Sequence, residues 1–383
     1  MEKQSKKIVI VSGEASGDLH GAYLVREMKA LDPGLIFTGI GGEHMRAAGV
    51  DILVDSSEMS VVGLTEAVVK IGTIIRVRRL LKRYLEREKP GLVILIDYPE
   101  FNLYLARMAK TMGLKVFYYI SPQVWAWRKN RVFKIARCVD AMAVILPFEK
   151  KFYDAVTLDV EFVGHPLLDI VKPHLGREEA RQRFGMDDGM TAVALLPGSR
   201  VNEVKKLLPP MLHAASIIAA RYDNIHFILP LANTLDRAFV QGYVDDAAVT
   251  VTVVDDATYD VIAASDAAVV TSGTATLETA LLETPMIIVY VVSPLSYMMG
   301  RLFIRIDHIG LANIVAGTTI VPELIQGNAT GENIARELAG LLDDKEKMRD
   351  MRRKLHDVKK KLGEPGAAAR AARKGYALLS RKD

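Results

Sequence analysis

Polar side chains follow several short apolar runs in this 383-residue chain, and the first that could do chemistry is Asp97. Asp97 ends the run LVILID and precedes Tyr98 and Pro99. A carboxylate at the end of an apolar run can cap the next helix. It can also act as a general base when a substrate hydroxyl comes within hydrogen-bond reach. We predict a catalytic proton acceptor at Asp97, with helix capping as the alternative.

Two other segments favour phosphate binding. Pro197-Gly198-Ser199-Arg200 follows the run AVALLP, and the paired donors of an arginine suit phosphate oxygens. The segment SGTATLE follows the run AVVTS, and its small residues allow a diphosphate to approach the free amides of a helix start. A carboxylate one turn later is placed to accept hydrogen bonds from a ribose. The expected ligand contacts are Arg200, Gly273, Thr274, Ala275, Thr276 and Glu278. An ordinary helix N-cap at Ser272 or Thr274 is compatible with this role.

A glycine-rich turn follows the first apolar run, at SGEASGDLHG. Its glycines allow close approach of a ligand to the backbone, but the spacing is not G-x-G-x-x-G, so a dinucleotide site is not indicated. Glu14, Ser16 and Asp18 are candidates for an acceptor site. The alternative is a structural turn in which Ser16 or Asp18 caps the following helix.

The elements that must position these residues form a repeated pattern. Apolar runs without polar alternation are typical of parallel strands buried on both faces, and here they alternate with helical stretches in both halves of the chain. We expect an α/β protein with two doubly wound Rossmann-like domains facing a cleft. The expected boundaries are 1–168, joined by the tail 364–383, and 169–363. Ligands of such sheets bind beyond the carboxyl ends of the strands, where the candidate residues lie.

Composition narrows the functional classes. The net charge of +4 does not indicate nucleic-acid binding, and a single cysteine, Cys138, excludes an internal disulfide and a multi-cysteine zinc site. The chain has no P-loop motif and no H-E-x-x-H motif. We therefore expect a reaction without a metal or cofactor. No apolar stretch approaches the ~18 residues of a membrane span, which predicts a cytoplasmic protein with at most peripheral membrane contact.

Taken together, these segments resemble the lipid-A-disaccharide synthases, a family of bacterial glycosyltransferases with two Rossmann-like domains of the GT-B type. The resemblance covers nearly the whole chain. The segments that carry it are SGEASGDLHG, IDYPEFN, ISPQVWAWRKNRVFKI, LPFEKKFYD, FVGHPL, LLPGSRVNEV, SGTATLE and LANI. Two positions depart from the usual pattern of the family, Ala15 and Ala312.

The resemblance implies a reaction and its partners. The donor would be UDP-2,3-diacylglucosamine, the acceptor 2,3-diacylglucosamine 1-phosphate (lipid X), and the products a β-1,6-linked disaccharide 1-phosphate and UDP, with inversion at the anomeric carbon. The resemblance implies catalytic roles for Asp97 and Arg200. It also places Arg200, Glu278 and Asn313 around UDP or the reacting groups. A homodimer is left open.

Two alternatives remain at this stage. The same layout suits a UDP-N-acetylglucosamine epimerase, which needs no acceptor. It also suits a protein that binds a UDP-sugar or lipid without turnover, although a carboxylate at the position of Asp97 argues against that.

Lipid substrates without a spanning segment imply docking at the cytoplasmic surface of the inner membrane. The segment from 59 to 85 combines apolar residues with a basic second part. A helix packed on the sheet accounts for Ile71–Leu85, whereas Gly63 interrupts a helical stripe before it. We therefore predict that Met59, Val61, Val62 and Leu64 are exposed and contact the membrane or the acyl chains.

Overall fold

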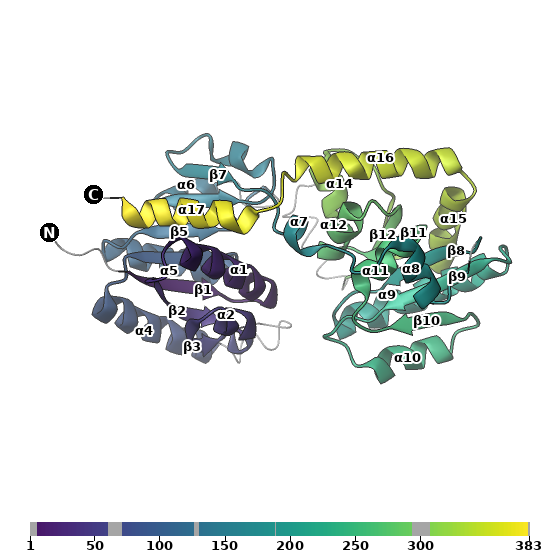
Figure 1. Cartoon of the computed structure of the whole chain (residues 1–383), viewed down its shortest axis with the longest axis horizontal. Coiled ribbons are helices and arrows are strands. Elements are labelled where there is room, and N and C mark those ends of the chain that lie inside the picture. Colours follow the sequence, from purple (N-terminus) through teal and green to yellow (C-terminus); the bar gives the residue numbers. More distant parts are fainter. Residues whose placement is uncertain (1–5, 60–70, 126–129, 188, 293–306, 382–383) are drawn as a thin grey trace. The chain divides into compact units, whose positions relative to one another are not determined.

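The chain forms two compact units in a computed structural model that describes residues 6–59, 71–125, 130–187, 189–292 and 307–381. The first unit comprises Met1–Pro166 and Gly363–Asp383, and the second Leu167–Leu362. Each unit is an α/β domain with one parallel sheet between layers of helices (Figure 1). No helix in the described ranges is both long enough and apolar enough to span a membrane.

The described part of the first unit holds a seven-stranded parallel sheet in the order β3-β2-β1-β4-β5-β6-β7. The strand order reverses between β1 and β4, which is where a doubly wound sheet places its ligand. The strands are β1 (Lys7–Ser12), β2 (Ile36–Gly41), β3 (Val50–Asp55), β4 (Leu92–Ile96), β5 (Val116–Tyr119), β6 (Ala141–Val144) and β7 (Asp159–Phe162).

The continuous apolar runs are buried on both faces of this sheet, as a parallel sheet requires. Val9 and Val11 of β1 pack into one core, whereas Ile8 and Ile10 pack into the other. The first core includes side chains from α4 (Ile71–Glu88), α5 (Pro99–Thr111) and α6 (Arg131–Ala136). The second includes side chains from α1 (Ala15–Leu31) and α17 (Ala367–Ser380), and α2 (Glu43–Ala47) lies beside α1.

The C-terminal helix α17 belongs to the first unit, where it runs beside α1 (Figure 1). A Cβ atom added at Gly375 would lie 3.1 Å from the ring of Phe117, so glycine allows the helix to approach β5 closely. Lys374 forms ion pairs with Asp159, at 2.7 Å, and with Glu161, at 3.3 Å. These contacts attach the end of the chain to the same sheet that carries Asp97.

The described part of the second unit contains a six-stranded parallel sheet in the order β10-β9-β8-β11-β12-β13. The strands are β8 (Thr191–Leu196), β9 (Ile225–Pro230), β10 (Val251–Val254), β11 (Ala267–Thr271), β12 (Met286–Tyr290) and β13 (Glu323–Ile325). The helices are α7 (Leu167–Ile170), α8 (Arg177–Arg183), α9 (Val201–Ala219), α10 (Arg237–Asp245), α11 (Thr258–Ala264), α12 (Thr274–Leu281), α14 (Leu311–Ala316), α15 (Gly331–Leu342) and α16 (Lys345–Lys361).

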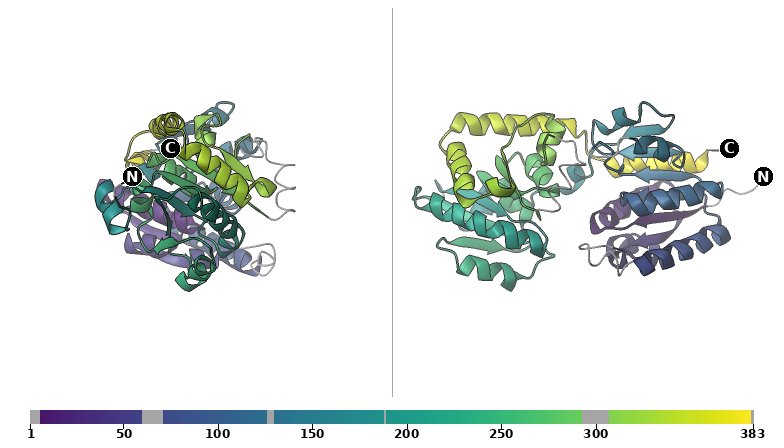
Figure 2. Two further views of the ribbon diagram at one scale, coloured as in Figure 1. Left: turned by 90° about the vertical axis from the view of Figure 1, so that its right-hand side faces the viewer. Right: turned by 180° about the vertical axis from the view of Figure 1, so that it is seen from behind.

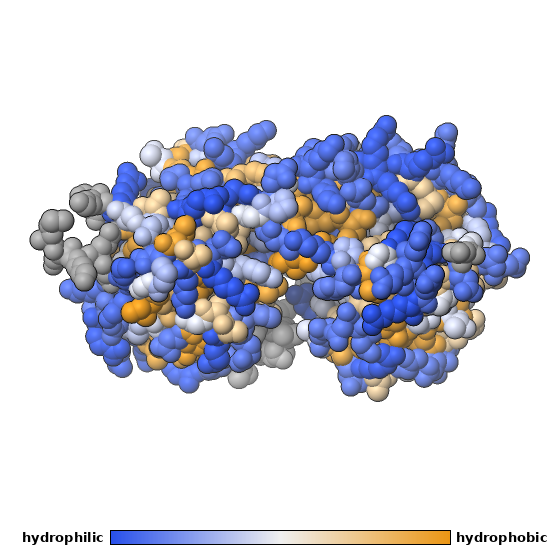
Figure 3. All heavy atoms as spheres, viewed as in Figure 1, coloured by the Kyte–Doolittle hydropathy of each residue, from blue (hydrophilic) through white to orange (hydrophobic). Residues whose placement is uncertain are grey.

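The helix α16 is rich in Lys and Arg. Met351, Leu355 and Val358 recur at helical spacing and are buried, while most of the remaining residues are charged. Its outer side is hydrophilic in Figure 3. The lysines and arginines of this helix therefore form a face that is exposed to solvent.

Candidate active site

Asp97 lies directly after β4 in a strained turn. Asp97 and Tyr98 both have a φ of 45°, and Ile120, at the end of the neighbouring strand β5, has a φ of 65°. Left-handed backbone is unfavourable for these residue types, above all for a β-branched isoleucine, and such outliers gather at functional sites. The turn is held by its own carbonyl, since Asp97 O accepts hydrogen bonds from Asn102 Nδ2 at 2.8 Å and from the Tyr118 hydroxyl at 2.6 Å.

The side chain of Asp97 is partly buried. The pKa of Asp97 is raised to about 6, mainly by burial and also by the negative charge of Glu14, while the Tyr98 amide lowers it. A carboxylate with a pKa near the working pH is both ionised and basic enough to accept a proton. The environment therefore suits the predicted general base.

The glycine-rich turn of β1 packs against the Asp97 turn. A Cβ atom at Gly13 would lie 2.4 Å from the ring of Tyr98, so any larger residue would displace that ring. Glu14 and Ser16 are exposed at the start of α1, and neither caps that helix with its side chain. The structure thus brings Glu14 into the electrostatic environment of Asp97. The side chains of Glu14 and Ser16 are both available to a ligand.

A buried polar cluster at the ends of β5 and β6 was not anticipated. The carboxylate of Glu149 accepts hydrogen bonds from the amides of Ile145 and Leu146, at 3.1 and 2.9 Å. Burial raises its pKa to about 7 despite these bonds. The hydroxyls of Ser121 and Tyr153 lie 2.7 Å apart. The only available signal was position, because Ser121 follows β5 and Glu149 follows β6.

Asp18 has a structural role instead of the predicted place in the acceptor site. It is buried, and its carboxylate accepts hydrogen bonds from the amides of Gly42, His44 and Met45, at 2.6, 3.0 and 3.1 Å. These donors are the free amides at the start of α2, which need such a partner. Asp18 therefore fixes α2 to α1.

The prediction that Met59 is exposed is wrong. Its side chain is 1% exposed and packs in the core beneath α4 and α5, and its carbonyl accepts a hydrogen bond from the Tyr98 hydroxyl at 3.1 Å. An unbranched apolar side chain fills this gap readily. Val61, Val62 and Leu64 lie outside the described residues.

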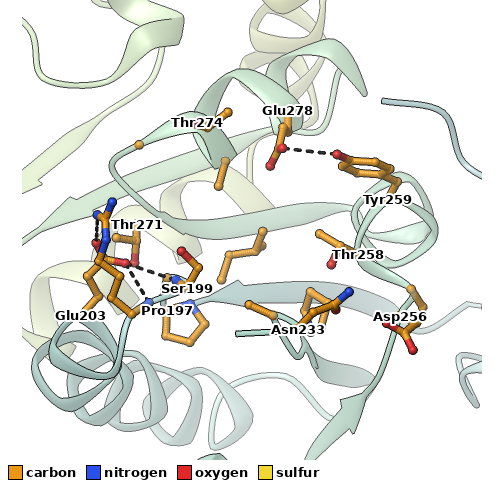
Figure 4. Close-up of a pocket in the computed structure, with 18 of the residues that line it drawn as sticks. Pro197, Ser199, Glu203, Asn233, Asp256, Thr258, Tyr259, Thr271, Thr274 and Glu278 are labelled. Atoms are coloured by element: carbon orange, nitrogen blue, oxygen red, sulfur yellow. Dashed lines mark hydrogen bonds and ion pairs between the residues drawn. The ribbon is translucent and has the colours of Figure 1, made fainter. Parts of the chain in front are cut away.

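The second unit contains a cavity of about 620 Å³ at the carboxyl ends of its strands (Figure 4). Its walls come from the segments after β8, β9, β10 and β11. They include the predicted Arg200, Gly273, Thr274, Ala275 and Glu278. A cavity of this size is large enough for a nucleotide.

Arg200 sits at the start of α9 in a turn that is organised by Glu203. The guanidinium of Arg200 donates to Glu203 Oε1 at 2.8 Å, and Glu203 Oε2 accepts from the amides of Ser199 and Arg200 at 3.2 and 3.3 Å. Gly198, with a φ of 109°, permits the turn. The Arg200 side chain is 72% exposed, so its remaining donors can reach an anion in the cavity.

Thr274 and Ala275 line the cavity at the first turn of α12, with Gly273 as the residue before the helix. The first amides of a helix have no partner within it and attract anions. Thr276, by contrast, is fully buried, and its hydroxyl donates to Gly273 O at 2.8 Å. The structure does not bring its side chain into the cavity as predicted.

Glu278 faces the cavity one turn further along α12, where the Tyr259 hydroxyl donates to its Oε1 at 3.3 Å (Figure 4). Burial raises the pKa of Glu278, and the bond from Tyr259 lowers it. Tyr259, Asn233 and Thr258 also line the cavity but were not predicted. Each lies shortly after a strand, which is the signal that could have identified them.

Asn313 does not line this cavity. It is fully buried, its Nδ2 donates to Val321 O at 2.9 Å and to Glu323 Oε1 at 2.7 Å, and its Oδ1 accepts from the amides of Ile320 and Val321. All its hydrogen-bonding groups are thus used within the protein. Asn313 supports the loop before β13, and its side chain has no donor or acceptor left over for UDP.

We expect Glu278→Ala to weaken UDP binding by about tenfold or more, because a hydrogen bond to a charged group is worth roughly 1.5–3 kcal/mol. Calorimetry with UDP and with 2′-deoxy-UDP measures the effect. If Glu278 holds the ribose, the variant loses less affinity for the deoxy nucleotide. The control is Tyr259→Phe, which removes the neighbouring donor and leaves the carboxylate. Equal UDP affinity in Glu278→Ala and the parent would contradict the ribose contact.

Solved structures of similar fold support the two-domain architecture. The UDP-GlcNAc 2-epimerase of Neisseria meningitidis, bound to UDP-GlcNAc, matches with a TM-score of 0.63 at 14% identity and covers 97% of this chain and 99% of that one. MurG of Acinetobacter baumannii matches with a TM-score of 0.58 at 14% identity, over 97% and 99% of the two chains. At this identity the likeness shows the fold alone.

Sequence relatives identify the family. The lipid-A-disaccharide synthase of Syntrophus aciditrophicus is 53% identical over 99% of both chains. That of Geobacter metallireducens is 50% identical over 99% of this chain and 98% of the relative. The sequence model described as "Lipid-A-disaccharide synthetase" matches residues 8–375. The chain therefore belongs to the lipid-A-disaccharide synthase family of glycosyltransferases.

Proposed function

We propose that this protein transfers 2,3-diacylglucosamine from its UDP derivative to 2,3-diacylglucosamine 1-phosphate (lipid X). The acceptor 6-hydroxyl attacks the anomeric carbon of the donor from the face opposite UDP. The bond from that carbon to the diphosphate breaks, UDP leaves, and the hydroxyl proton passes to the base. The product is the β-1,6-linked disaccharide 1-phosphate.

The roles in the proposed mechanism are divided between the two units, with the acceptor and the base in the first. Asp97 accepts the proton, and Glu14 and Ser16 are candidates for contacts with the acceptor. In the second unit, Arg200 and the amides of Thr274 and Ala275 stabilise the charge that develops on the diphosphate, and Glu278 accepts hydrogen bonds from the ribose. No step requires a metal.

Family membership along nearly the full chain carries this proposal. It also favours transfer over epimerisation, although epimerases share the fold. Incubation with both diacyl sugars, followed by mass spectrometry, should detect the tetraacyl disaccharide phosphate. UDP should be released only when the acceptor is present, and chelator should leave the rate unchanged. UDP release without acceptor, or sugar isomerisation without a disaccharide, would contradict the proposal.

We also propose peripheral association with the cytoplasmic surface of the inner membrane, since both lipid substrates reside in a membrane. Val61, Val62 and Leu64 remain the proposed contacts. Replacing Val61 and Val62 with serine is expected to lower vesicle binding and raise KM for the lipid acceptor, without lowering Tm. A variant that melts earlier but sediments with vesicles as before would place these residues in the core.

A further inference from the structure

The first unit has a second recess, of about 520 Å³, formed by the last turns of α5 and α6 and the residues after α6. Both helices run back from the carboxyl ends of the strands, so the recess lies toward the amino ends of β5 and β6, at the opposite edge of the sheet from Asp97. The residues that line it are Arg107, Lys110, Thr111, Lys134, Arg137 and Cys138. None of them belongs to the candidate active site.

Positive charge in this recess exceeds the negative charge that could neutralise it. The nearby carboxylate of Asp140 pairs with Lys110 and also accepts a hydrogen bond from the Val116 amide at 2.8 Å. Within the described ranges, no carboxylate forms an ion pair with Arg107, Lys134 or Arg137. Three exposed cations therefore converge on one recess without a counter-ion from these parts of the chain.

Stabilisation of the helix ends explains only part of this arrangement. Cations in a last turn interact favourably with the helix dipole, which accounts for Lys134 and Arg137 at the end of α6. Arg107 lies a full turn before the end of α5, and its approach to the α6 cations is electrostatically unfavourable. An anion with several acceptor oxygens would relieve that repulsion, and the arginine forks fit a phosphate.

Aromatic side chains on α5 and α6, the two helices that form the recess, indicate where that phosphate comes from. Phe133, beside Lys134, is 49% exposed, and Tyr104, one turn before Arg107, is 42% exposed. The Arg78 guanidinium lies 4.1 Å from the centre of the Tyr104 ring. Exposed aromatics next to cations are typical of surfaces at the lipid headgroup level. α4 lies alongside α5 on the same side of the sheet (Figure 2, right). Its residues Ile75 and Leu80 are exposed.

We propose that this recess binds the phosphate of an anionic phospholipid headgroup and is a membrane contact separate from the active site. The proposal rests on the peripheral membrane association proposed above. The lipid phosphate sits between the cations of α5 and α6, while Tyr104 and Phe133 lie at the headgroup level.

A charge-matched pair of variants tests this site. Arg107→Glu/Arg137→Glu reverses two recess cations, and Arg26→Glu/Arg373→Glu reverses two exposed arginines on α1 and α17, across the sheet. Vesicles of phosphatidylcholine with one quarter phosphatidylglycerol should bind the recess variant at least tenfold more weakly than the parent. The control should stay within about threefold, and vesicles of phosphatidylcholine alone should not distinguish the two. Equal losses in both variants would overturn the site, because net charge would then explain the binding.

Further measurements separate the other outcomes. If the charge-reversing variant of the recess lowers Tm, the neutral variant Arg107→Gln/Arg137→Gln is used in its place. It should still bind anionic vesicles more weakly than the control variant Arg26→Gln/Arg373→Gln. Activity on detergent-dispersed substrates should be unchanged in the recess variants. Loss of product in the parent protein would refute the proposed function, whereas failure of the vesicle test alone would refute only the recess. Inorganic phosphate should displace the parent from vesicles more than chloride of equal ionic strength does, because it competes for the recess. Phosphate binding that the recess variants lose, with their vesicle binding unchanged, would assign the recess to free phosphate and overturn the lipid assignment.

Discussion

Asp97→Asn is expected to lower turnover by about 10²-fold or more while UDP affinity stays the same, because it removes the proton acceptor and keeps the shape of the side chain. Asparagine is the informative substitution because it tolerates the left-handed conformation that residue 97 adopts, with its φ of 45°. Single-turnover kinetics and calorimetry with UDP provide the two measurements. Turnover within a few-fold of the parent would eliminate the general-base role.

The same substitution should not destabilise the protein. The pKa of Asp97 is raised to about 6 in the folded chain, above its ordinary value, so the ionised carboxylate is disfavoured by folding. The protonated carboxyl group carries no such cost. The contribution of Asp97 to stability is therefore present at low pH and is lost as the pH rises through about 6. At pH 7 the neutral asparagine should therefore give an equal or higher Tm. Asp55→Asn is the control, since Asp55 ends β3 and its carboxylate accepts a hydrogen bond from the Ser57 amide at 2.9 Å. That change should lower Tm and leave turnover intact.

The raised pKa also predicts the pH profile of the reaction. The base must be ionised to work, so kcat/KM should fall as the pH drops through about 6, instead of near 4 as for an ordinary aspartate. Glu14→Gln removes the negative charge that raises this pKa in addition to burial. The acidic limb of the profile should then move to lower pH. An acidic limb that is the same in both proteins would show that Glu14 does not influence the base.

The fold was predictable because its strongest signal is local. Each buried strand is a continuous apolar run, and the polar residue after it lies at the carboxyl end of a parallel sheet whatever the details of the loop. Asp97, Arg200 and Glu278 could be placed near these strand ends in this way. Their positions depend on the strand that precedes them and require no knowledge of distant contacts.

The errors concern residues whose partners are distant in the chain or hidden. Asp18 appears available in the sequence, but its carboxylate is taken by amides 24 to 27 residues away. The resemblance implies that Asn313 lies around UDP, but its side chain forms three hydrogen bonds with the loop before β13 and one with Glu323 of β13. Met59 follows a strand in a segment without helical periodicity, and nothing local shows that the core beneath α4 has room for it. Residue type indicates the chemistry a side chain can do, whereas tertiary structure decides whether it is free to do it.

Arg200→Ala is expected to reduce kcat/KM for the UDP-sugar by about 10²-fold or more, the usual effect of removing one donor to a developing anion. Folding should be almost unaffected, since the side chain is 72% exposed and its ion pair with Glu203 is of a kind that contributes only ~0–1 kcal/mol. Arg353→Ala is a closely matched control. Arg353 is 74% exposed and pairs with a carboxylate three residues away, but it lies on α16. Its loss should change neither turnover nor Tm.

The chemistry of the guanidinium makes the prediction more specific. Arg200→Lys keeps the charge but loses the paired donors, so it should recover only a small part of the activity. Free guanidinium ion, added at concentrations that do not unfold the protein, should partly restore turnover in Arg200→Ala. It should have no such effect on Arg200→Lys, where the ammonium occupies the site.

Glu203 already binds one donor edge of Arg200. Glu203→Gln should therefore loosen the turn, lower Tm modestly and leave Arg200 able to reach the diphosphate. Full activity in Arg200→Ala, or equal rescue by lysine, would show that the diphosphate charge is stabilised by the α12 amides without this arginine.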